Sequence, residues 1–100
     1  MSRRDALKDL EEVFPKIVRL MPDEFDSHDF ILVLAQKHQK LYVQALFTTK
    51  DENLPFNRTH MAIGKRLKRH KDLVEQIGNR NSANIFGLES KVAVWRKVKK

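Results

Sequence analysis

The sequence predicts an α+β fold that is mostly helical, with a three-helix core followed by a C-terminal β-hairpin. As far as about residue 70, apolar residues recur at spacings of three and four, which is typical of amphipathic helices. After Lys71 the period changes to two, and residues 92–98 are a β-branched and aromatic run typical of a strand. The 100 residues include only three Gly and three Pro, so we expect one domain over residues 1–100 with a single core.

The N-terminal segment, residues 1–24, is predicted to be helical. Its apolar stripe consists of Leu7, Leu10, Phe14, Ile17 and Met21. Because proline lacks a backbone donor and clashes with the preceding helical turn, Pro15 predicts either a kink or two short helices, the second starting at Pro15. Pro22 is expected to end the segment.

Residues 25–98 are predicted to form a helix-loop-helix followed by the hairpin. Asp26 and Ser27 are good N-cap residues for a central helix over residues 28–48, which contain no Gly or Pro. A break in this helix at residues 38–40 is an alternative. Polar residues then predict a loop over residues 49–55.

The third helix is predicted to start near Asn57 or Thr59, either of which can cap it, and to end near residues 69–70. Its expected buried face consists of His60, Ile63, Gly64 and Leu67. Two strands should follow, over residues 73–77 and 92–98, joined by a long polar connection over residues 78–91. Trp95 is expected to be a core residue that holds the hairpin onto the helices.

The net charge of +7 is unevenly distributed along the chain. Residues 1–50 contain eight basic and eight acidic residues, whereas residues 51–100 contain twelve basic and five acidic ones. Between Asn53 and Lys71 there are six basic residues and no acidic residue. Such an asymmetry indicates a polyanionic partner.

Several classes of protein are disfavoured by the composition. The absence of Cys excludes a disulfide framework and a cysteine zinc site, and suits the cytoplasm. The longest apolar run, residues 30–35, is far shorter than the roughly 20 residues that span a bilayer, and the first residues do not resemble a signal peptide. We therefore expect a cytoplasmic protein with no membrane partner.

No catalytic or cofactor site is expected. Ser27, His28 and Asp29 are adjacent on a helix start, whereas the members of a catalytic triad meet by folding from distant positions. The four histidines lack the spacing of metal ligands, and the single glycines form no phosphate-binding loop. We accordingly predict no enzyme activity, no metal and no cofactor.

The order of these elements resembles a winged helix-turn-helix domain over residues 25–98. The resemblance is carried by the capped second helix beginning Asp-Ser-His-Asp-Phe at residues 26–30, by the third helix at residues 57–67, and by the hairpin from Leu73 to Arg96. It implies that the third helix is a recognition helix for the major groove of DNA and that the hairpin is a wing beside the phosphate backbone. The connection over residues 49–57 and the wing are both longer than is usual in that family.

A set of candidate nucleic-acid-binding residues follows. The basic side chains of the third helix are expected to pair with phosphates, the residues near its N-terminus to face base edges, and the polar residues of the wing to add a second contact. These groups are, in the same order, Lys65, Arg66, Lys68 and Arg69; Asn57, Arg58, Thr59 and Met61; and Asn79, Arg80 and Asn81.

Double-stranded DNA is the partner that these patterns favour, and two alternatives stay open. One is RNA. The other is a protein-interaction module that docks an acidic partner, because a fold does not determine a function. A docking module should expose a contiguous apolar patch, for which the candidates are Phe47, Leu54, Phe56, Ile85 and Phe86.

Overall fold

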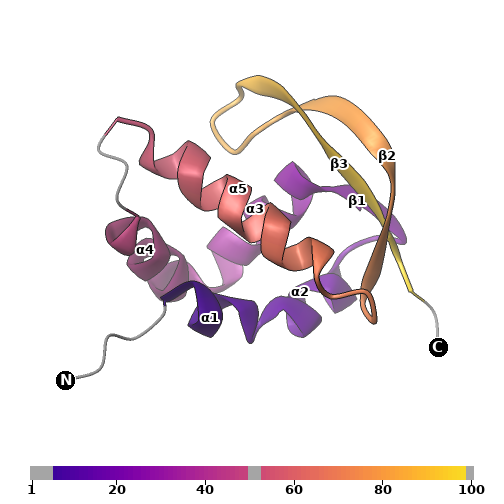
Figure 1. Cartoon of the computed structure of the whole chain (residues 1–100), viewed down its shortest axis with the longest axis horizontal. Coiled ribbons are helices and arrows are strands. Elements are labelled where there is room, and N and C mark those ends of the chain that lie inside the picture. The colour runs from indigo at the N-terminus through magenta and orange to yellow at the C-terminus, as the bar shows by residue number, and fades with distance from the viewer. Residues whose placement is uncertain (1–5, 50–52, 99–100) are drawn as a thin grey trace.

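A computed structural model describes residues 6–49 and 53–98 of the chain. Within these ranges the fold is α+β, with five helices and a three-stranded antiparallel sheet (Figure 1). The bounds are α1 Ala6–Glu11, α2 Phe14–Leu20, β1 Glu24–Asp26, α3 Ser27–Lys37, α4 Gln39–Thr48, α5 Pro55–Lys68, β2 Val74–Ala83 and β3 Glu89–Lys97. None of the helices in these ranges has the length and apolar character needed to cross a bilayer.

The first predicted helical segment is two helices, which is one of the two alternatives that Pro15 left open. The chain leaves the helical path after Glu11 and resumes it at Phe14, with Pro15 in the first turn of α2. That position suits proline, because the amides of the first turn have no partner inside the helix. The helix α2 ends at Leu20, before Pro22. The predicted stripe is buried at Leu10, Phe14, Ile17 and Met21.

The central segment also divides, at His38, where the backbone dihedral angles (φ −132°, ψ 59°) are not helical. The break allows α4 to pack against α1 while α3 packs against the sheet. The predicted cap of α3 is confirmed. Asp26 Oδ1 accepts the amide proton of Asp29 (2.8 Å), and Asp29 Oδ2 accepts that of Asp26 (3.1 Å), which together form a capping box.

The sheet has the strand order β1-β3-β2. Its first strand, β1, was not predicted, because three residues directly before a helix are too few to show an alternating pattern. Phe25 lies opposite Trp95, and Asp26 lies opposite Val94. Through this short strand, the chain just before α3 is hydrogen-bonded to the hairpin.

The predicted strands were too short. The polar connection expected over residues 78–91 is mostly strand, and the loop between β2 and β3 is confined to residues 84–88. Asn has low strand propensity, but here Asn79 and Asn81 occupy exposed positions paired across the hairpin. In the loop, Gly87 has a left-handed φ of 82°, which favours glycine.

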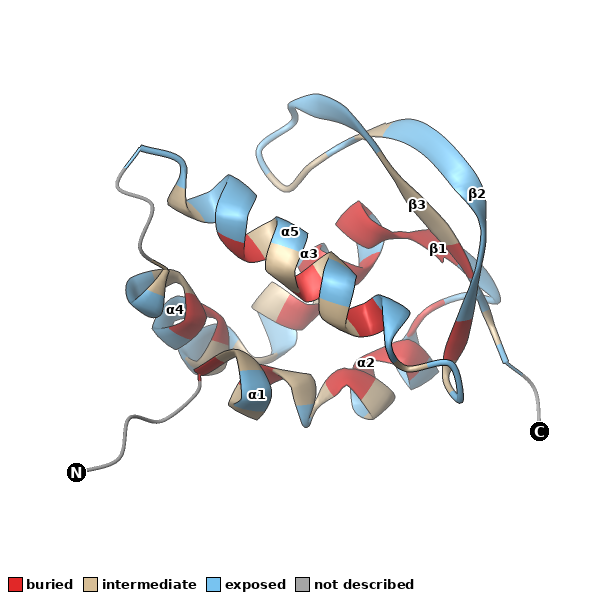
Figure 2. Cartoon of the chain, in the orientation of Figure 1, coloured by how far each residue is buried: buried red, intermediate tan, exposed pale blue. Residues whose placement is uncertain are grey.

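Trp95 is a core residue, as predicted, with 2% of its surface exposed. Its indole Nε1–H donates a hydrogen bond to Ser27 Oγ (2.9 Å). The rest of the core includes the aromatic cluster of Phe14, Phe25 and Phe30. Figure 2 shows buried residues on the inward faces of the helices, whereas most of the β2–β3 hairpin is exposed.

The helix α5 starts at Pro55, before either predicted cap, and no side chain caps it. Proline is tolerated there because its missing N–H needs no partner in the first turn. Ile63 and Leu67 are buried as predicted, whereas His60 and Gly64 are partly exposed, and the third buried residue is Thr59.

Candidate functional site

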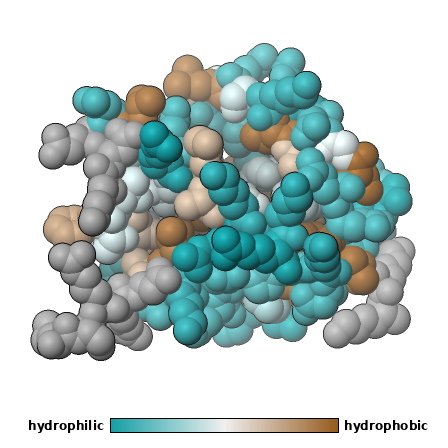
Figure 3. Space-filling model, in the orientation of Figure 1, coloured by the Kyte–Doolittle hydropathy of each residue, from teal (hydrophilic) through white to brown (hydrophobic). Residues whose placement is uncertain are grey.

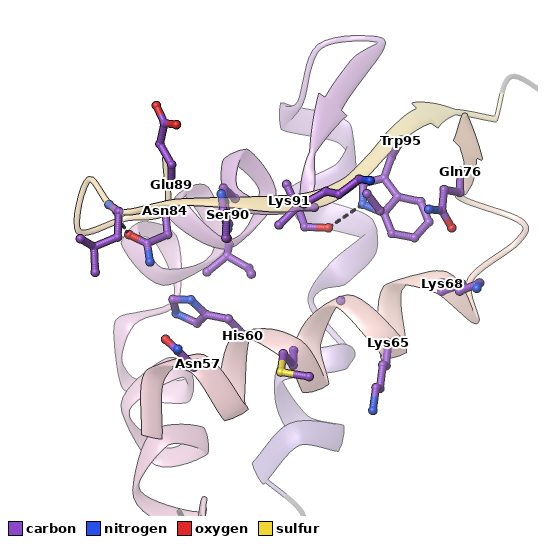
Figure 4. A pocket seen from close by; sticks show the side chains of 18 residues that line it. Asn57, His60, Lys65, Lys68, Gln76, Asn84, Glu89, Ser90, Lys91 and Trp95 are labelled. Atoms are coloured by element: carbon purple, nitrogen blue, oxygen red, sulfur yellow. Dashed lines mark hydrogen bonds between the residues drawn. The ribbon is translucent and has the colours of Figure 1, made fainter. Parts of the chain in front are cut away.

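A cleft of about 670 Å³ lies between α5 and the β2–β3 hairpin (Figure 4). One wall is the outward side of α5, the other is the hairpin, and the first residues of α3 lie between them. The lining residues are Asn57, His60, Met61, Gly64, Lys65 and Lys68 on α5; Gln76, Asn84, residues 88–93 and Trp95 on the hairpin; and Ser27, His28 and Ile31 on α3.

The helical repeat explains which residues of α5 reach the cleft. Residues spaced by three and four share a face, so burial of Thr59, Ile63 and Leu67 leaves another face turned outward. Of the predicted contacts on α5, Asn57, Met61, Lys65 and Lys68 line the cleft. The α5 side of the cleft therefore has a polar residue, Asn57, near the start of the helix and two cations, Lys65 and Lys68, toward its end.

Three consecutive residues at the start of α3 hold the hairpin. Asp26 Oδ2 accepts a hydrogen bond from Arg80 Nε (2.9 Å), and Ser27 Oγ accepts one from Trp95. The ring of His28 contacts both strands: Nδ1 lies 2.9 Å from Ser82 Oγ and Nε2 lies 3.3 Å from Ser90 Oγ. The hairpin wall of the cleft is thus fixed to the helical core.

The cations that line the cleft are all lysines. Lys65 and Lys68 come from α5 and Lys91 from β3. None of the three forms an ion pair with another residue in the described part of the chain. Glu89 is the one carboxylate among the lining residues, so three lysine charges against one carboxylate leave the cleft with a positive charge of two.

Arg66 was expected to contact a phosphate, but it lies on the opposite side of α5. Its guanidinium Nη1 donates to Glu11 Oε1 (2.9 Å), and His70 Nε2 lies 2.6 Å from Glu11 Oε2. Burial alone would raise the pKa of Glu11, but hydrogen bonds and charge from His70 and Arg66 outweigh it and lower that pKa. Arg66 therefore joins α5 to the end of α1 and is removed from the candidate site.

Arg80 also has an internal role. It lies within β2 and not at the tip of the hairpin, and its guanidinium contacts Asp26 and Asp29 Oδ2 (3.2 Å). Its charge is thus matched by two carboxylates, and it secures the hairpin to α3. Asn79 and Asn81 are exposed and lie opposite Ala93 and Lys91, so they share a strand face with two residues that line the cleft.

Thr59 was expected to face base edges, and its burial contradicts this prediction. Its exposure is 1%, and its hydroxyl lies 2.5 Å from Thr49 Oγ1 at the end of α4. Arg58 and Arg69 are exposed but do not line the cleft. These two arginines therefore lie outside the cleft that Lys65, Lys68 and Lys91 line.

Sequence reasoning missed Lys91, the amides of the hairpin and the role of two histidines. Lys91 alternates with Ala93 and Trp95, so the period-2 pattern held a signal for its direction. No local pattern could predict that Lys91 lines the same cleft as Lys65, because only the tertiary fold places the hairpin beside α5. His60 was expected on the buried face of the third helix and is partly exposed to the cleft, and the buried His28 lines the cleft as well.

His60 forms a hydrogen bond with Tyr42 at the edge of the cleft. Burial, with a smaller effect of the nearby His28, lowers the pKa of His60 to about 4, so the ring is neutral near pH 7. Burial raises the pKa of Tyr42 to about 12, so its hydroxyl is also neutral, and it lies 2.5 Å from His60 Nε2. The other ring nitrogen, Nδ1, forms no hydrogen bond with another residue in the described ranges.

An aromatic pair links α5 to the loop of the hairpin. The rings of Phe56 and Phe86 meet edge to face with centroids 4.7 Å apart, although 38% and 53% of these residues is exposed. Phe47 and Leu54 are also exposed, whereas Ile85 is partly buried against the core. Figure 3 shows hydrophobic residues in separate patches on a largely hydrophilic face.

No group of three or more metal-ligating side chains is found within residues 6–49 and 53–98. Comparison of the chain with protein-family models, curated proteins and solved structures finds no significant match.

Proposed function

We propose that this chain is a non-enzymatic nucleic-acid-binding domain that holds double-stranded DNA between α5 and the hairpin. The observation that carries the proposal is that Lys65, Lys68 and Lys91, from two elements, line one cleft and form no ion pair among the described residues. Lysine ammonium groups bind phosphate oxygens, and clustered cations favour a polyanion.

The winged-helix reading of the fold belongs to the same proposal. An antiparallel hairpin directly after the basic helix, paired through β3 with a short strand before α3, supports it. In this arrangement α5 serves as the recognition helix and the hairpin as the wing. Asn57 and Met61 are the side chains of α5 that approach base edges, and Lys65, Lys68 and Lys91 contact phosphates.

The test is fluorescence anisotropy with a labelled random-sequence duplex. If three phosphates are contacted, log K falls with log salt at a slope of about −2.7, so affinity drops about 40-fold between 50 and 200 mM salt. Replacing Lys65, Lys68 and Lys91 together with Glu should abolish binding. In the matched control, Glu replaces Lys16, Lys37 and Lys40, which are exposed lysines of the N-terminal half.

Equal loss of binding in both triple variants would contradict the site and indicate a general charge effect. Competition by unlabelled duplex, single-stranded DNA and RNA identifies the preferred nucleic acid. Stronger competition by RNA than by duplex DNA would overturn the DNA assignment.

A second candidate function is docking of an acidic protein. Exposure of Phe56 and Phe86 beside the cleft favours it, because aromatic residues, Phe included, are enriched at protein interfaces relative to the rest of the surface. The Phe86→Ser variant separates the two functions. It should leave the salt slope for duplex DNA in place, whereas it should weaken a protein complex that is anchored on these rings.

A further inference from the structure

The shape of the cleft has a consequence for the kind of DNA that it takes. A hollow of about 670 Å³ falls within the roughly 300–1,000 Å³ of sites for small organic ligands. A fully paired duplex held between α5 and the hairpin leaves the interior of such a hollow unfilled, because its bases are stacked inside the helix. A single nucleotide that has swung out of the stack can enter it.

The interior of the cleft suits the face of a nucleobase. Met61 and Ala93 contribute apolar surface, and the edges of Ile31 and Trp95, each of which is 2% exposed, also line the cleft. Trp95 is positioned by its hydrogen bond to Ser27 (2.9 Å). Apolar and aromatic walls of this kind hold an extruded base against solvent.

Polar groups around the interior match the edge of a base. Asn84 Oδ1 accepts the amide protons of Phe86 (2.9 Å) and Leu88 (3.0 Å), which leaves its NH₂ group as a donor. The amide of Asn57 has no hydrogen bond to another residue in the described ranges. Side-chain amides make paired hydrogen bonds to base edges, and the neutral imidazole of His60 adds a third polar group.

The charged and aromatic groups at the rim complete the site. Lys65, Lys68 and Lys91 are the cations among the lining residues, and they can pair with the phosphates on either side of an extruded nucleotide. In the sequence, Phe86 comes between Asn84 and Leu88, which both line the cleft. Its exposed ring offers a stacking surface to a neighbouring base.

We propose that the cleft between α5 and the hairpin binds one unstacked nucleotide of a DNA duplex, such as a bulged or flipped base. This inference rests on the proposed function and narrows it to duplexes in which a base has left the stack. The apolar interior receives the base, the amides read its edge, and the three lysines hold the flanking phosphates.

The experiment compares two duplexes with the same number of base pairs. In one, a single extra 2-aminopurine forms a bulge in one strand, and in the other, 2-aminopurine is part of a base pair. Wild-type protein should bind the bulged duplex at least about tenfold more tightly, since the unpaired base is extruded at little cost. Binding should change the fluorescence of the bulged probe and not that of the paired one.

Two variants test whether the cleft is responsible. In Gly64→Leu the new side chain occupies the cleft, where a Cβ at this position meets nothing closer than Ser27 Oγ at 4.0 Å. It should lower the ratio of the two affinities toward one. Asn57→Ala, at an exposed position, should lower that ratio about tenfold without affecting folding. Gln36→Leu on α3 is the control and should keep the ratio.

The outcomes are distinct. If wild-type protein binds both duplexes equally, the nucleotide pocket is wrong and the DNA-binding function stands. If it binds neither, the proposed function itself fails. If the ratio is high but Gly64→Leu and Asn57→Ala both retain it, the unstacked base is recognised elsewhere and the inference is overturned.

Discussion

Replacement of Asp26 by Ala should destabilise the fold more than replacement of any other carboxylate in β1 or α3 that pairs with the hairpin. Asp26 is 1% exposed and accepts hydrogen bonds from Asp29 N–H and from Arg80. Loss of the helix cap costs about 1 kcal/mol, and loss of a hydrogen bond to a charged group costs about 1.5–3 kcal/mol. Because the guanidinium of Arg80 is half exposed and regains water, we expect a total of about 2–4 kcal/mol.

The assay is thermal and urea unfolding followed by circular dichroism. A loss of this size lowers the Tm of a domain of about 100 residues by roughly 10–25 °C. Glu24→Ala is the matched control, because Glu24 also lies in β1 and pairs with Arg96 of the hairpin (3.1 Å), but both side chains are about half exposed. An exposed pair contributes less than about 1 kcal/mol. Equal losses in the two variants would refute the reasoning.

The effect of Asp26 should also depend on pH. Burial alone would raise the pKa of Asp26, but hydrogen bonds from Asp29 N–H, Ser82 and Arg80 outweigh it and lower the pKa below its ordinary value of 3.8. A carboxyl group with a lowered pKa stabilises the fold above its unfolded pKa, and this contribution disappears as pH falls through the folded pKa. The gap between wild type and Asp26→Ala should therefore narrow below about pH 4; a gap of constant size between pH 7 and pH 2 would contradict this.

Three further changes test other parts of the structure. Gly64→Ala should stabilise the protein by about 0.5–1 kcal/mol, because its Cβ meets only ordinary contacts in a helix interior, and a loss of stability in urea unfolding would show that the site is more crowded. Gly87→Ala should cost about 1–2 kcal/mol, because φ is 82° there, and an unchanged urea midpoint would argue against that backbone conformation. His60→Gln should remove a pH dependence: the pKa of His60 in the fold is about 4 and its ordinary value is 6.5, so the unfolded chain binds the proton first and wild-type stability falls as pH drops from 6.5 to 4. If the variant loses stability as steeply as wild type over that range, His60 is not the group responsible.

Features that depend on a few neighbouring residues were predictable from the sequence. Pro15 predicted either a kink or two short helices, and the structure has two, the second of which starts at Phe14, one residue before the predicted start. Asp26 capped α3 as expected, because the acceptor and the amide that it serves are three residues apart. Trp95 was assigned to the core from its place in an apolar strand.

Features that depend on distant partners were not predictable. The polar half of β2 has weak strand propensity, and it is held by Arg80 and Ser82, whose partners lie more than 50 residues away. In the sequence, Arg66 and its neighbour Lys65 are equivalent basic residues, because no neighbouring residue indicates that Glu11 contacts Arg66 in the fold. Within the candidate site, Lys65 and Lys68 were predicted from their charge, whereas Lys91 lines the same cleft because the fold places the hairpin beside α5.

The attachment of the hairpin to Asp26, Ser27 and His28 makes the cleft a preorganised site. Its second wall is held by contacts with Arg80, Trp95, Ser82 and Ser90, and these contacts form when the chain folds. Ordering a single side chain during association costs about 0.5–1.5 kcal/mol. A ligand that enters between α5 and the hairpin therefore meets a wall whose conformational entropy has already been lost, and more of its interaction energy is retained as affinity.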